Sequence, residues 1–207
     1  MMLALSWLPP RLRHILLGWG AVGCAYTLGS VWPGAPRLLP EWPTDRWIAF
    51  DPAAIWLYLS FFLLVPAGFL LAPPDRLPWL RRSMQLCALA AGATFLLLPT
   101  TLPYPAVAGG GFHAELLRAA LRFDTPHNCL PSLHGALTVL AAWALSERRR
   151  PWRAVLAWLW AAAILFAVIQ LRRHLTLDLG AGVALGLLCG WLCARPAFLF
   201  SFRYRTT

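Results

Sequence analysis

Two short motifs, 40 residues apart, carry side chains suited to acid–base or nucleophilic chemistry. The first is Pro131-Ser132-Leu133-His134, and the second contains His174 and Asp178. Each motif opens a strongly apolar run of the chain. Because ionisable groups at the mouth of a membrane span are costly, they mark a functional site by default. Two imidazoles and a carboxylate are the groups expected for chemistry on a phosphate.

The elements that must position these residues are apolar helices. The chain is 59% hydrophobic with a mean hydropathy of +0.61, and only 13% of its 207 residues are charged. A soluble domain carries about a quarter charged residues, and about 20 apolar residues cross a bilayer. We therefore predict an all-α polytopic membrane protein with a single domain, 1–207, and six transmembrane helices. The predicted spans are 14–32, 53–73, 83–103, 131–147, 153–171 and 176–194.

The basic charge indicates orientation in the membrane. All 18 basic residues are arginine, and they are dispersed over the loops between spans, which excludes a nucleic-acid-binding protein. Twelve arginines fall on the side of the two termini and six on the other side, so the positive-inside rule predicts cytoplasmic termini. We expect the first span to be retained as an anchor. His134 and His174 then both lie at the outer ends of helices.

Each motif also has a local logic. Pro131 suits the first position of a helix, which would leave the N–H groups of Ser132 and Leu133 free for a phosphate oxygen, with the Ser132 hydroxyl as a further donor. Asp178 can hold one imidazole nitrogen of His174 and leave the other free to attack. Arg172 and Arg173, directly before His174, provide positive charge for the phosphate oxygens.

The long loop 104–130 contains a segment with helical character. In 113–122, leucines and alanines occupy one side, while Glu115, Arg118 and Arg122 occupy the other. Two interpretations remain open at this point. The segment is either a short helix lying in the membrane interface or a helix that aims Arg118 or Arg122 at a lipid phosphate.

The two motifs resemble those of the type 2 phosphatidic acid phosphatase superfamily. Residues 131–134 match its P-S-x-H motif, and His174 with Asp178 match its H-x-x-x-D motif. The resemblance covers about residues 50–194, and the flanking 124–130 and 179–182 are similar to the branch of inositol phosphorylceramide synthases and related bacterial proteins.

The resemblance implies a role for each matching residue. His174 would be the nucleophile that forms a phosphohistidine, Asp178 would orient it, and His134 would protonate the leaving oxygen. Such enzymes need no metal and no other cofactor. The resemblance also implies a bacterial inner-membrane protein.

Two departures from the family pattern concern phosphate binding. The superfamily's first motif ends in Arg-Pro, whereas Tyr104-Pro105 stands at that place, and Val168 stands where an arginine commonly precedes the nucleophile by six residues. Replacement arginines would come from 172, 173, 118 or 122. Of the two next to His174, we expect Arg172 to face the substrate and Arg173 to reach the headgroups.

The sequence thus predicts an enzyme that cleaves or transfers a lipid-linked phosphate at the outer leaflet, with hydrolysis preferred to transfer. Its partners would be a lipid phosphate and the bilayer, and its oligomeric state stays open. One alternative is a non-catalytic lipid-binding or transport relative, favoured by the missing arginines. A zinc enzyme that uses His127, Cys129, His134 and His174 is the other alternative.

Overall fold

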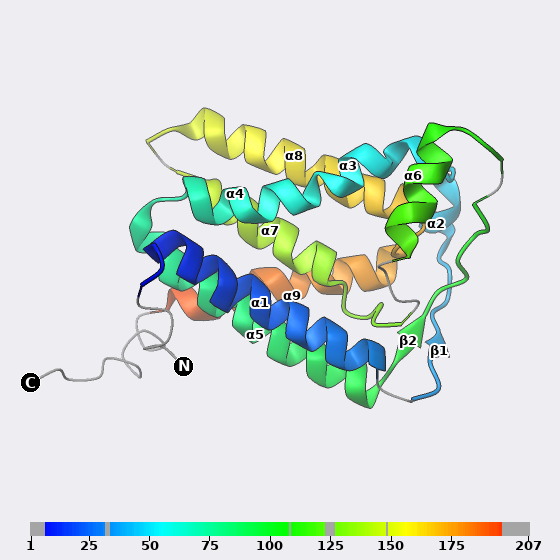
Figure 1. The fold of residues 1–207 in the computed structure, drawn as a ribbon, viewed down its shortest axis with the longest axis horizontal. Helices are drawn as coiled ribbons and strands as arrows, with labels where there is room; N and C mark the ends of the chain where they lie inside the picture. The colour runs from blue at the N-terminus through cyan, green and yellow to red at the C-terminus, as the bar shows by residue number, and fades with distance from the viewer. Residues whose placement is uncertain (1–6, 32–33, 108, 123–126, 148, 196–207) are drawn as a thin grey trace, which may run out of the picture.

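The chain folds into a bundle of long helices with a cap of short elements at one end (Figure 1). The computed structural model describes residues 7–31, 34–107, 109–122, 127–147 and 149–195. The helices are α1 (Pro10–Val31), α2 (Pro43–Trp47), α3 (Ile55–Leu59), α4 (Phe61–Leu71), α5 (Leu77–Leu97), α6 (Phe112–Leu121), α7 (Leu133–Leu145), α8 (Pro151–Gln170) and α9 (Thr176–Ala194), with the 3-10 turns η2 (Pro52–Ala54) and η3 (Pro74–Arg76). The fold is mostly helical, as predicted.

A small sheet that the sequence did not predict joins two of the loops. Strand β1 (Arg37–Leu38) pairs in parallel with β2 (Thr100–Thr101). Strands of two residues are too short to show an alternating pattern, so periodicity cannot reveal them. The pairing ties the loop after α1 to the end of α5 at the capped end of the bundle.

Helix α7 is the central helix of the bundle. It packs against α4, α5, α8 and α9, while α1 packs along α5. Ten of its 13 residues are buried, namely Leu133, Gly135, Ala136, Leu137, Thr138, Val139, Leu140, Ala141, Ala142 and Ala144. Many of them are small, and small residues let helix backbones approach closely in a membrane protein.

A row of glycines on α9 sets its close contact with α7. A Cβ added at Gly182 would lie 2.0 Å from the carbonyl oxygen of Ser132, and one added at Gly186 would lie 2.5 Å from that of Ala136. Both distances are far below van der Waals contact, so no side chain fits at either position. The glycines, four residues apart on one face, therefore fix the register of the two helices that carry the histidine motifs.

Four of the six predicted spans are long and apolar enough to cross a membrane. In the described part of the chain they are Pro10–Val31, Pro52–Leu71, Pro151–Gln170 and Thr176–Ala194. The predicted span 131–147 is the 13-residue α7, shorter than expected, and 83–103 gives way to α5, which begins at Leu77 and ends at Leu97. Arg81, Arg82 and Gln85 near the start of α5 lower its hydropathy.

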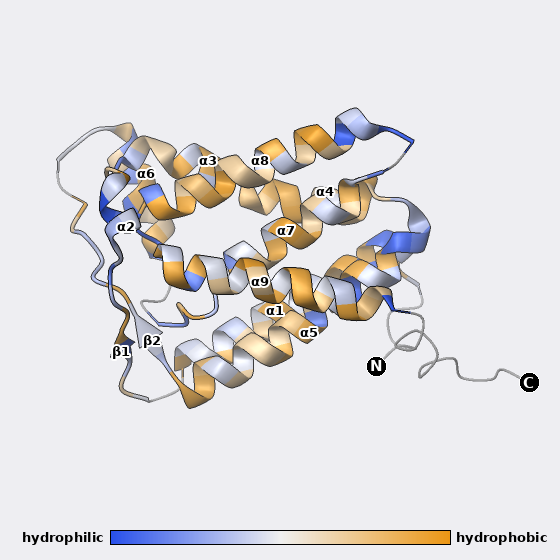
Figure 2. Ribbon diagram, turned by 180° about the vertical axis from the view of Figure 1, so that it is seen from behind, coloured by the Kyte–Doolittle hydropathy of each residue, from blue (hydrophilic) through white to orange (hydrophobic). Residues whose placement is uncertain are grey.

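The outer faces of the bundle are strongly apolar. Orange covers much of the long helices in Figure 2, whereas blue is concentrated at their ends and in the loops. Exposed leucines on these faces include Leu63, Leu70, Leu97, Leu159 and Leu188. Apolar surface of this extent is typical of a protein that meets a lipid phase. The composition, the long apolar helices and this surface together indicate a membrane protein.

The predicted helix in the loop 104–130 is present as α6. It extends over Phe112–Leu121 and packs against α3 and η2. Ala114 and Leu117 are buried, while Glu115 is exposed, so the helix has the two-sided character expected from its sequence. Its position at a membrane interface stays a prediction.

Candidate active site

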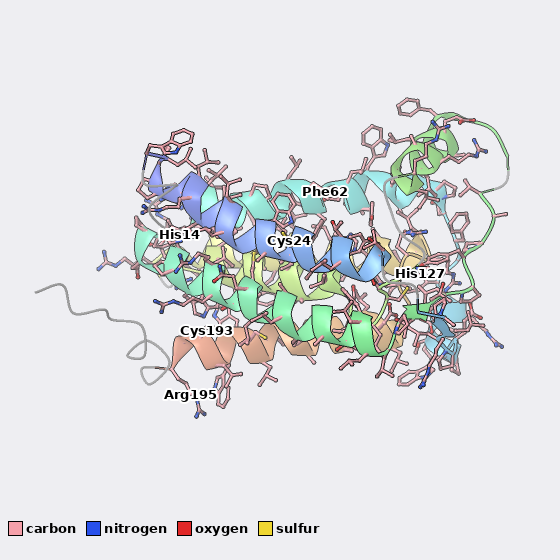
Figure 3. All side chains as sticks on the ribbon, turned by 60° about the horizontal axis from the view of Figure 1, so that its bottom comes forward. His14, Cys24, Phe62, His127, Cys193 and Arg195 are labelled. Atoms are coloured by element: carbon pink, nitrogen blue, oxygen red, sulfur yellow. The ribbon has the colours of Figure 1, made fainter. Side chains whose placement is uncertain are left out.

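The two histidine motifs meet at the capped end of the bundle, where α7 and α9 begin. His127, which lines the same cavity as the motifs, lies at this end, whereas His14 and Arg195 lie at the opposite end (Figure 3). Because α7 and α9 both start here, their first turns lie side by side. The structure therefore brings together the three residues that the sequence predicted to converge, His134, His174 and Asp178.

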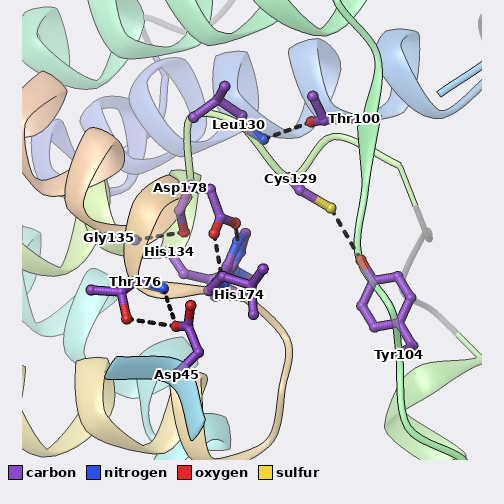
Figure 4. Close-up of polar contacts among 12 residues, drawn as sticks. Asp45, Thr100, Tyr104, Cys129, Leu130, His134, Gly135, His174, Thr176 and Asp178 are labelled. Atoms are coloured by element: carbon purple, nitrogen blue, oxygen red, sulfur yellow. Dashed lines mark hydrogen bonds and ion pairs between the residues drawn. The ribbon is translucent and has the colours of Figure 1, made fainter. Parts of the chain in front are cut away.

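The three side chains form a chain of hydrogen bonds (Figure 4). Nδ1 of His174 is bonded to Oδ2 of Asp178, and Nε2 of His174 lies 3.2 Å from Nδ1 of His134. Asp178 is fully buried, and its other oxygen accepts the backbone N–H of Leu175 at 2.7 Å. This arrangement orients the His174 ring and directs Nε2 toward the second imidazole.

His174 itself lies outside the helix that supplies Asp178. Helix α9 begins at Thr176, so the four-residue spacing of the motif is not one turn of a regular helix. The contact forms because Asp178, the third residue of α9, turns back over the helix N-terminus toward the preceding loop. A carboxylate at this position is also stabilised by the helix dipole.

Ser132 joins the two motifs and does not point into the cavity. It caps the start of α7, where its hydroxyl oxygen accepts the Gly135 N–H at 3.2 Å, and its own N–H donates to the Asp178 carbonyl at 3.0 Å. The expectation of Pro131 as first helical residue and of a free Ser132 N–H was therefore wrong, because the helix begins at Leu133. Ser132 is fully buried and positions the motifs relative to each other.

The adjacent arginines before His174 point in different directions. The Arg173 N–H donates to the Val168 carbonyl and the Arg172 N–H to that of Ile169, which is the Schellman pattern at the end of α8. Its left-handed residue is Arg172, with φ of 52°. The left-handed turn sends the two side chains to opposite sides of the loop.

Arg173 is the arginine that reaches the site. It is buried, it lines the cavity beside His174, and its guanidinium lies 4.4 Å from the centre of the Tyr104 ring. Arg172 instead donates to the carbonyls of Asp45 and, at 2.9 Å, Ile48. The geometry thus opposes the preference for Arg172 over Arg173.

The arginines of α6 also lie away from the site. Arg118 pairs with Glu115 and donates to the carbonyls of Val107 and Gly109. Arg122 follows the last residue of α6 and is exposed. Both are outside the set of described residues that line the cavity. Their contacts hold the loop to α6 and leave Arg173 as the nearby cation.

A cavity of about 390 Å³ opens next to the two histidines. Its walls come mainly from α1, α3, α4 and α7, and the His134 ring packs between Tyr58 and Phe61, at centroid distances of 5.2 and 4.7 Å. The lining residues are Trp19, Val22, Gly23, Tyr26, Tyr58, Leu59, Phe61, Phe62, Tyr104, Ala120, His127, Asn128, Cys129, Leu133, His134, Leu137, Arg173 and His174. The lining thus combines many apolar and aromatic side chains with the polar groups of His127, Asn128, His134, Arg173 and His174.

The two residues that stand where the resemblance implies arginines lie in different parts of the structure. Tyr104 lines the cavity, and its hydroxyl lies 3.1 Å from the Cys129 sulfur. Val168 is fully buried in the core of the bundle. Tyr104 thus contacts the arginine that occupies the site, whereas Val168 has a packing role.

The zinc alternative lacks the required arrangement. His127, Cys129, His134 and His174 all line the cavity. Even so, no group of three or more His, Cys, Asp or Glu side chains in the described ranges is placed to hold a metal ion. The Cys129 sulfur instead contacts Tyr104, and His174 contacts Asp178 and His134.

Sequence analysis missed two contributors to this end of the molecule. The cavity wall from α1 includes Trp19 and Tyr26, but an apolar helix gives no signal that separates a cavity face from a lipid face. Asp45 is a fully buried acid that binds Thr176. The only sequence signal for Asp45 is the scarcity of acids, since Asp and Glu together number 8 in the chain.

The comparisons with known proteins agree with the motifs. A family model described as the PAP2 superfamily matches residues 37–192, which include both histidine motifs, Asp45 and most of the bundle. No curated protein and no solved structure is significantly similar to the chain.

Proposed function

The chain belongs to the PAP2 superfamily, and from that premise we propose that it removes phosphate from a membrane lipid through a phosphohistidine at His174. Membership supports a lipid enzyme of the phosphatase or phosphotransferase type in general. The observation that carries the specific proposal is the bonded series Asp178–His174–His134 beside the cavity. It supplies a nucleophile, its orienting carboxylate and an acid within one site.

In the first half-reaction, the bond from Nε2 of His174 to phosphorus forms while the bond from phosphorus to the leaving oxygen breaks. Asp178 accepts a hydrogen bond from the Nδ1–H of His174, which leaves the lone pair on Nε2 for attack. His134 gives its proton to the leaving oxygen, so the lipid alcohol departs neutral. Since Nε2 lies 3.2 Å from Nδ1 of His134, the two rings must separate when the phosphoryl group binds.

In the second half-reaction, water attacks phosphorus and the Nε2–phosphorus bond breaks. His134, now neutral, takes the proton of the attacking water and is restored for the next turnover. An alcohol in place of water gives transfer instead of hydrolysis by the same steps. We favour hydrolysis, with a transferase of the inositol phosphorylceramide synthase type as the second candidate.

Charge on the transferred phosphoryl group requires a cation at the site. Catalysis of phosphoryl transfer rests largely on stabilising the charge of its non-bridging oxygens. Arg173 is the candidate, because it lines the cavity next to His174. Its stacking on Tyr104 holds the guanidinium in place before substrate binds. We thus assign phosphate binding to Arg173 in place of Arg172, Arg118 and Arg122.

The chemistry is proposed to take place at the outer face of six spans. The long helices alternate in direction along the chain in Figure 1. Arginines gather at the starts of α1, α5 and α8 and at the end of α9, opposite the site; they are Arg11, Arg13, Arg76, Arg81, Arg82, Arg149, Arg150, Arg153 and Arg195. The positive-inside rule makes that end cytoplasmic. In this arrangement α5 and the short α7 complete the set of six.

A direct test is phosphate release by the purified protein in detergent from a panel of lipid phosphates. The panel contains phosphatidic acid, phosphatidylglycerol phosphate and undecaprenyl pyrophosphate, each with and without an alcohol acceptor. Release that persists with a chelator and vanishes in His174→Ala supports the proposal. Lipid binding without turnover of any member would instead identify a non-catalytic relative.

A further inference from the structure

One buried residue binds the chain on both sides of His174. Oδ1 of Asp45, in α2, accepts the Thr176 backbone N–H at 2.6 Å and the Thr176 hydroxyl at 2.5 Å. The Asp45 backbone carbonyl accepts the guanidinium of Arg172. Residues 172 and 176 each lie two positions from His174. The loop that carries His174 is therefore fastened at both flanks to the same point of α2.

The contacts of Asp45 fix its carboxylate firmly. It has no exposed surface, and its second oxygen accepts the Trp42 N–H at 2.8 Å. Burying a carboxylate is unfavourable unless hydrogen bonds replace the lost water. Here three donors do so, and bonds to an ionised acceptor are about twice as strong as neutral ones. The segment 42–45 and the start of α9 therefore form one rigid unit.

The bond to Thr176 also completes the N-terminus of α9. Thr176 is the first residue of this helix, and the first N–H groups of a helix have no partner within it. Asp178 takes the Leu175 N–H, and Asp45 takes the next one along the chain. Each of the two carboxylates thus accepts one backbone N–H at the start of α9, directly after His174. Of the two, Asp178 is the one that contacts the His174 imidazole.

We propose that Asp45 is a positioning residue for the reaction at His174. It binds Thr176 and Arg172 and so fixes the loop that carries His174, which keeps Nε2 directed toward the space between the two imidazoles. The inference deepens the proposed function and rests on it for its kinetic part. Asp45 lies outside the described cavity lining, so its loss changes the placement of His174 and not the contacts with substrate.

The test compares Asp45→Asn with a matched control, Asp51→Asn. An asparagine at 45 has nearly the same shape, but its amide nitrogen cannot accept, so Trp42 or Thr176 loses its acceptor. Asp51 is an exposed acid nearby in sequence that accepts the Ala53 N–H at 2.8 Å and caps η2. Both variants remove one negative charge, which leaves the buried bonds of Asp45 to Trp42 and Thr176 as the main difference between them.

Kinetics are measured on the lipid phosphate that wild type hydrolyses fastest. We expect Asp45→Asn to lower kcat about 10- to 100-fold, because a displacement of about 1 Å from the attack geometry has effects of this size, with KM nearly unchanged. Thr176→Val should lower kcat less, since the bond from the backbone N–H of residue 176 to Asp45 stays. Thr176→Ser keeps the hydroxyl and should therefore have a kcat close to that of wild type. Asp51→Asn should behave as wild type. A rise in KM alone for Asp45→Asn, or equal kinetics for both asparagine variants, overturns the inference.

Amide hydrogen exchange gives a readout that needs no activity. In the purified full-length protein, a peptide covering 172–178 should exchange faster in Asp45→Asn than in Asp51→Asn, while α8 keeps its protection. Unchanged exchange in this peptide contradicts the positioning role even if kcat falls. If wild type releases no phosphate from any lipid, the proposed function fails, and the exchange result still decides whether Asp45 holds the loop.

Discussion

The two histidines are held in place by different means. His134 lies in the first turn of α7, a helix that is buried on nearly all sides, and its ring packs against Tyr58 and Phe61. His174 lies in a loop, where its hydrogen bond to Asp178 and the bonds of Asp45 to the neighbouring residues fix it. Packing therefore places the proposed acid, whereas polar bonds place the proposed nucleophile. The two sites should respond differently to mutation.

The largest effect is expected from His174→Ala. This variant cannot form the phosphohistidine, so phosphate release should fall to background and no covalently phosphorylated protein should form. The measurement is turnover together with labelling by a lipid carrying radioactive phosphate, quenched in alkaline detergent because the phosphorus–nitrogen bond of phosphohistidine is labile in acid. Near-normal turnover would rule out His174 as the nucleophile and would end the distinction between the two histidines.

A smaller and substrate-dependent loss is expected from His134→Ala. General acid catalysis contributes about 10²–10⁴-fold, and its removal matters most when the leaving oxygen is a poor leaving group. Lipid alkoxides should therefore show the full loss, whereas an aryl phosphate should show little. The ratio of kcat/KM for the two substrates measures this. An equal loss for both would mean that His134 orients His174 and does not transfer the proton.

The contribution of helix packing to the site can be tested at the glycines of α9 that contact α7. Gly182→Ala brings a methyl group to within 2.0 Å of the Ser132 carbonyl oxygen if nothing moves, so the helices must separate. We expect a loss of about 1–3 kcal/mol of stability and a marked fall in activity. Gly180→Ala is the control, because a Cβ there meets nothing within 4 Å. Thermal unfolding in detergent that fails to distinguish the two variants would contradict the close contact.

The smallest of these effects should separate the two neighbouring arginines. Arg173→Ala is expected to lower kcat/KM at least about tenfold, or about 1.4 kcal/mol, through lost phosphate stabilisation. Arg173→Lys should recover part of this, because lysine lacks the planar fork. Arg172→Ala should lower kcat with little change in KM, because Arg172 is one of the two residues through which Asp45 holds the His174 loop. Steady-state kinetics of the three variants test this, and the same pattern for both alanine variants would contradict the divergent turn.

The features that sequence could predict are those that depend on local chemistry. Apolar runs predicted helices, and the matching direction of 131–147 and 176–194 predicted that His134 and His174 would lie at one end. The number of spans was harder, because α7 needs only 13 residues when neighbouring helices cover it. Hydropathy alone cannot distinguish a short helix that other helices surround from a helix that spans the whole bilayer.

The features that sequence could not predict depend on contacts between distant segments. Asp45 and Thr176 are 131 residues apart, and nothing in either neighbourhood indicates the pairing. The divergence of Arg172 and Arg173 depends on a left-handed residue after α8, a position where glycine is the usual signal and arginine stands instead. Consecutive arginines gave no reason to prefer one over the other.

Two of the helices that line the cavity, α1 and α4, carry none of the proposed catalytic groups. Trp19 belongs to α1 and Phe62 to α4, whereas His134 belongs to α7, His174 to the loop before α9 and Asp178 to α9. We therefore expect the shape of the cavity to depend in part on residues that take no part in the proposed bond-breaking. Under the proposed function, substitutions in α1 are expected to reshape the cavity without touching the histidines, so that enzymes of this architecture would share one reaction and differ in the lipid that they accept.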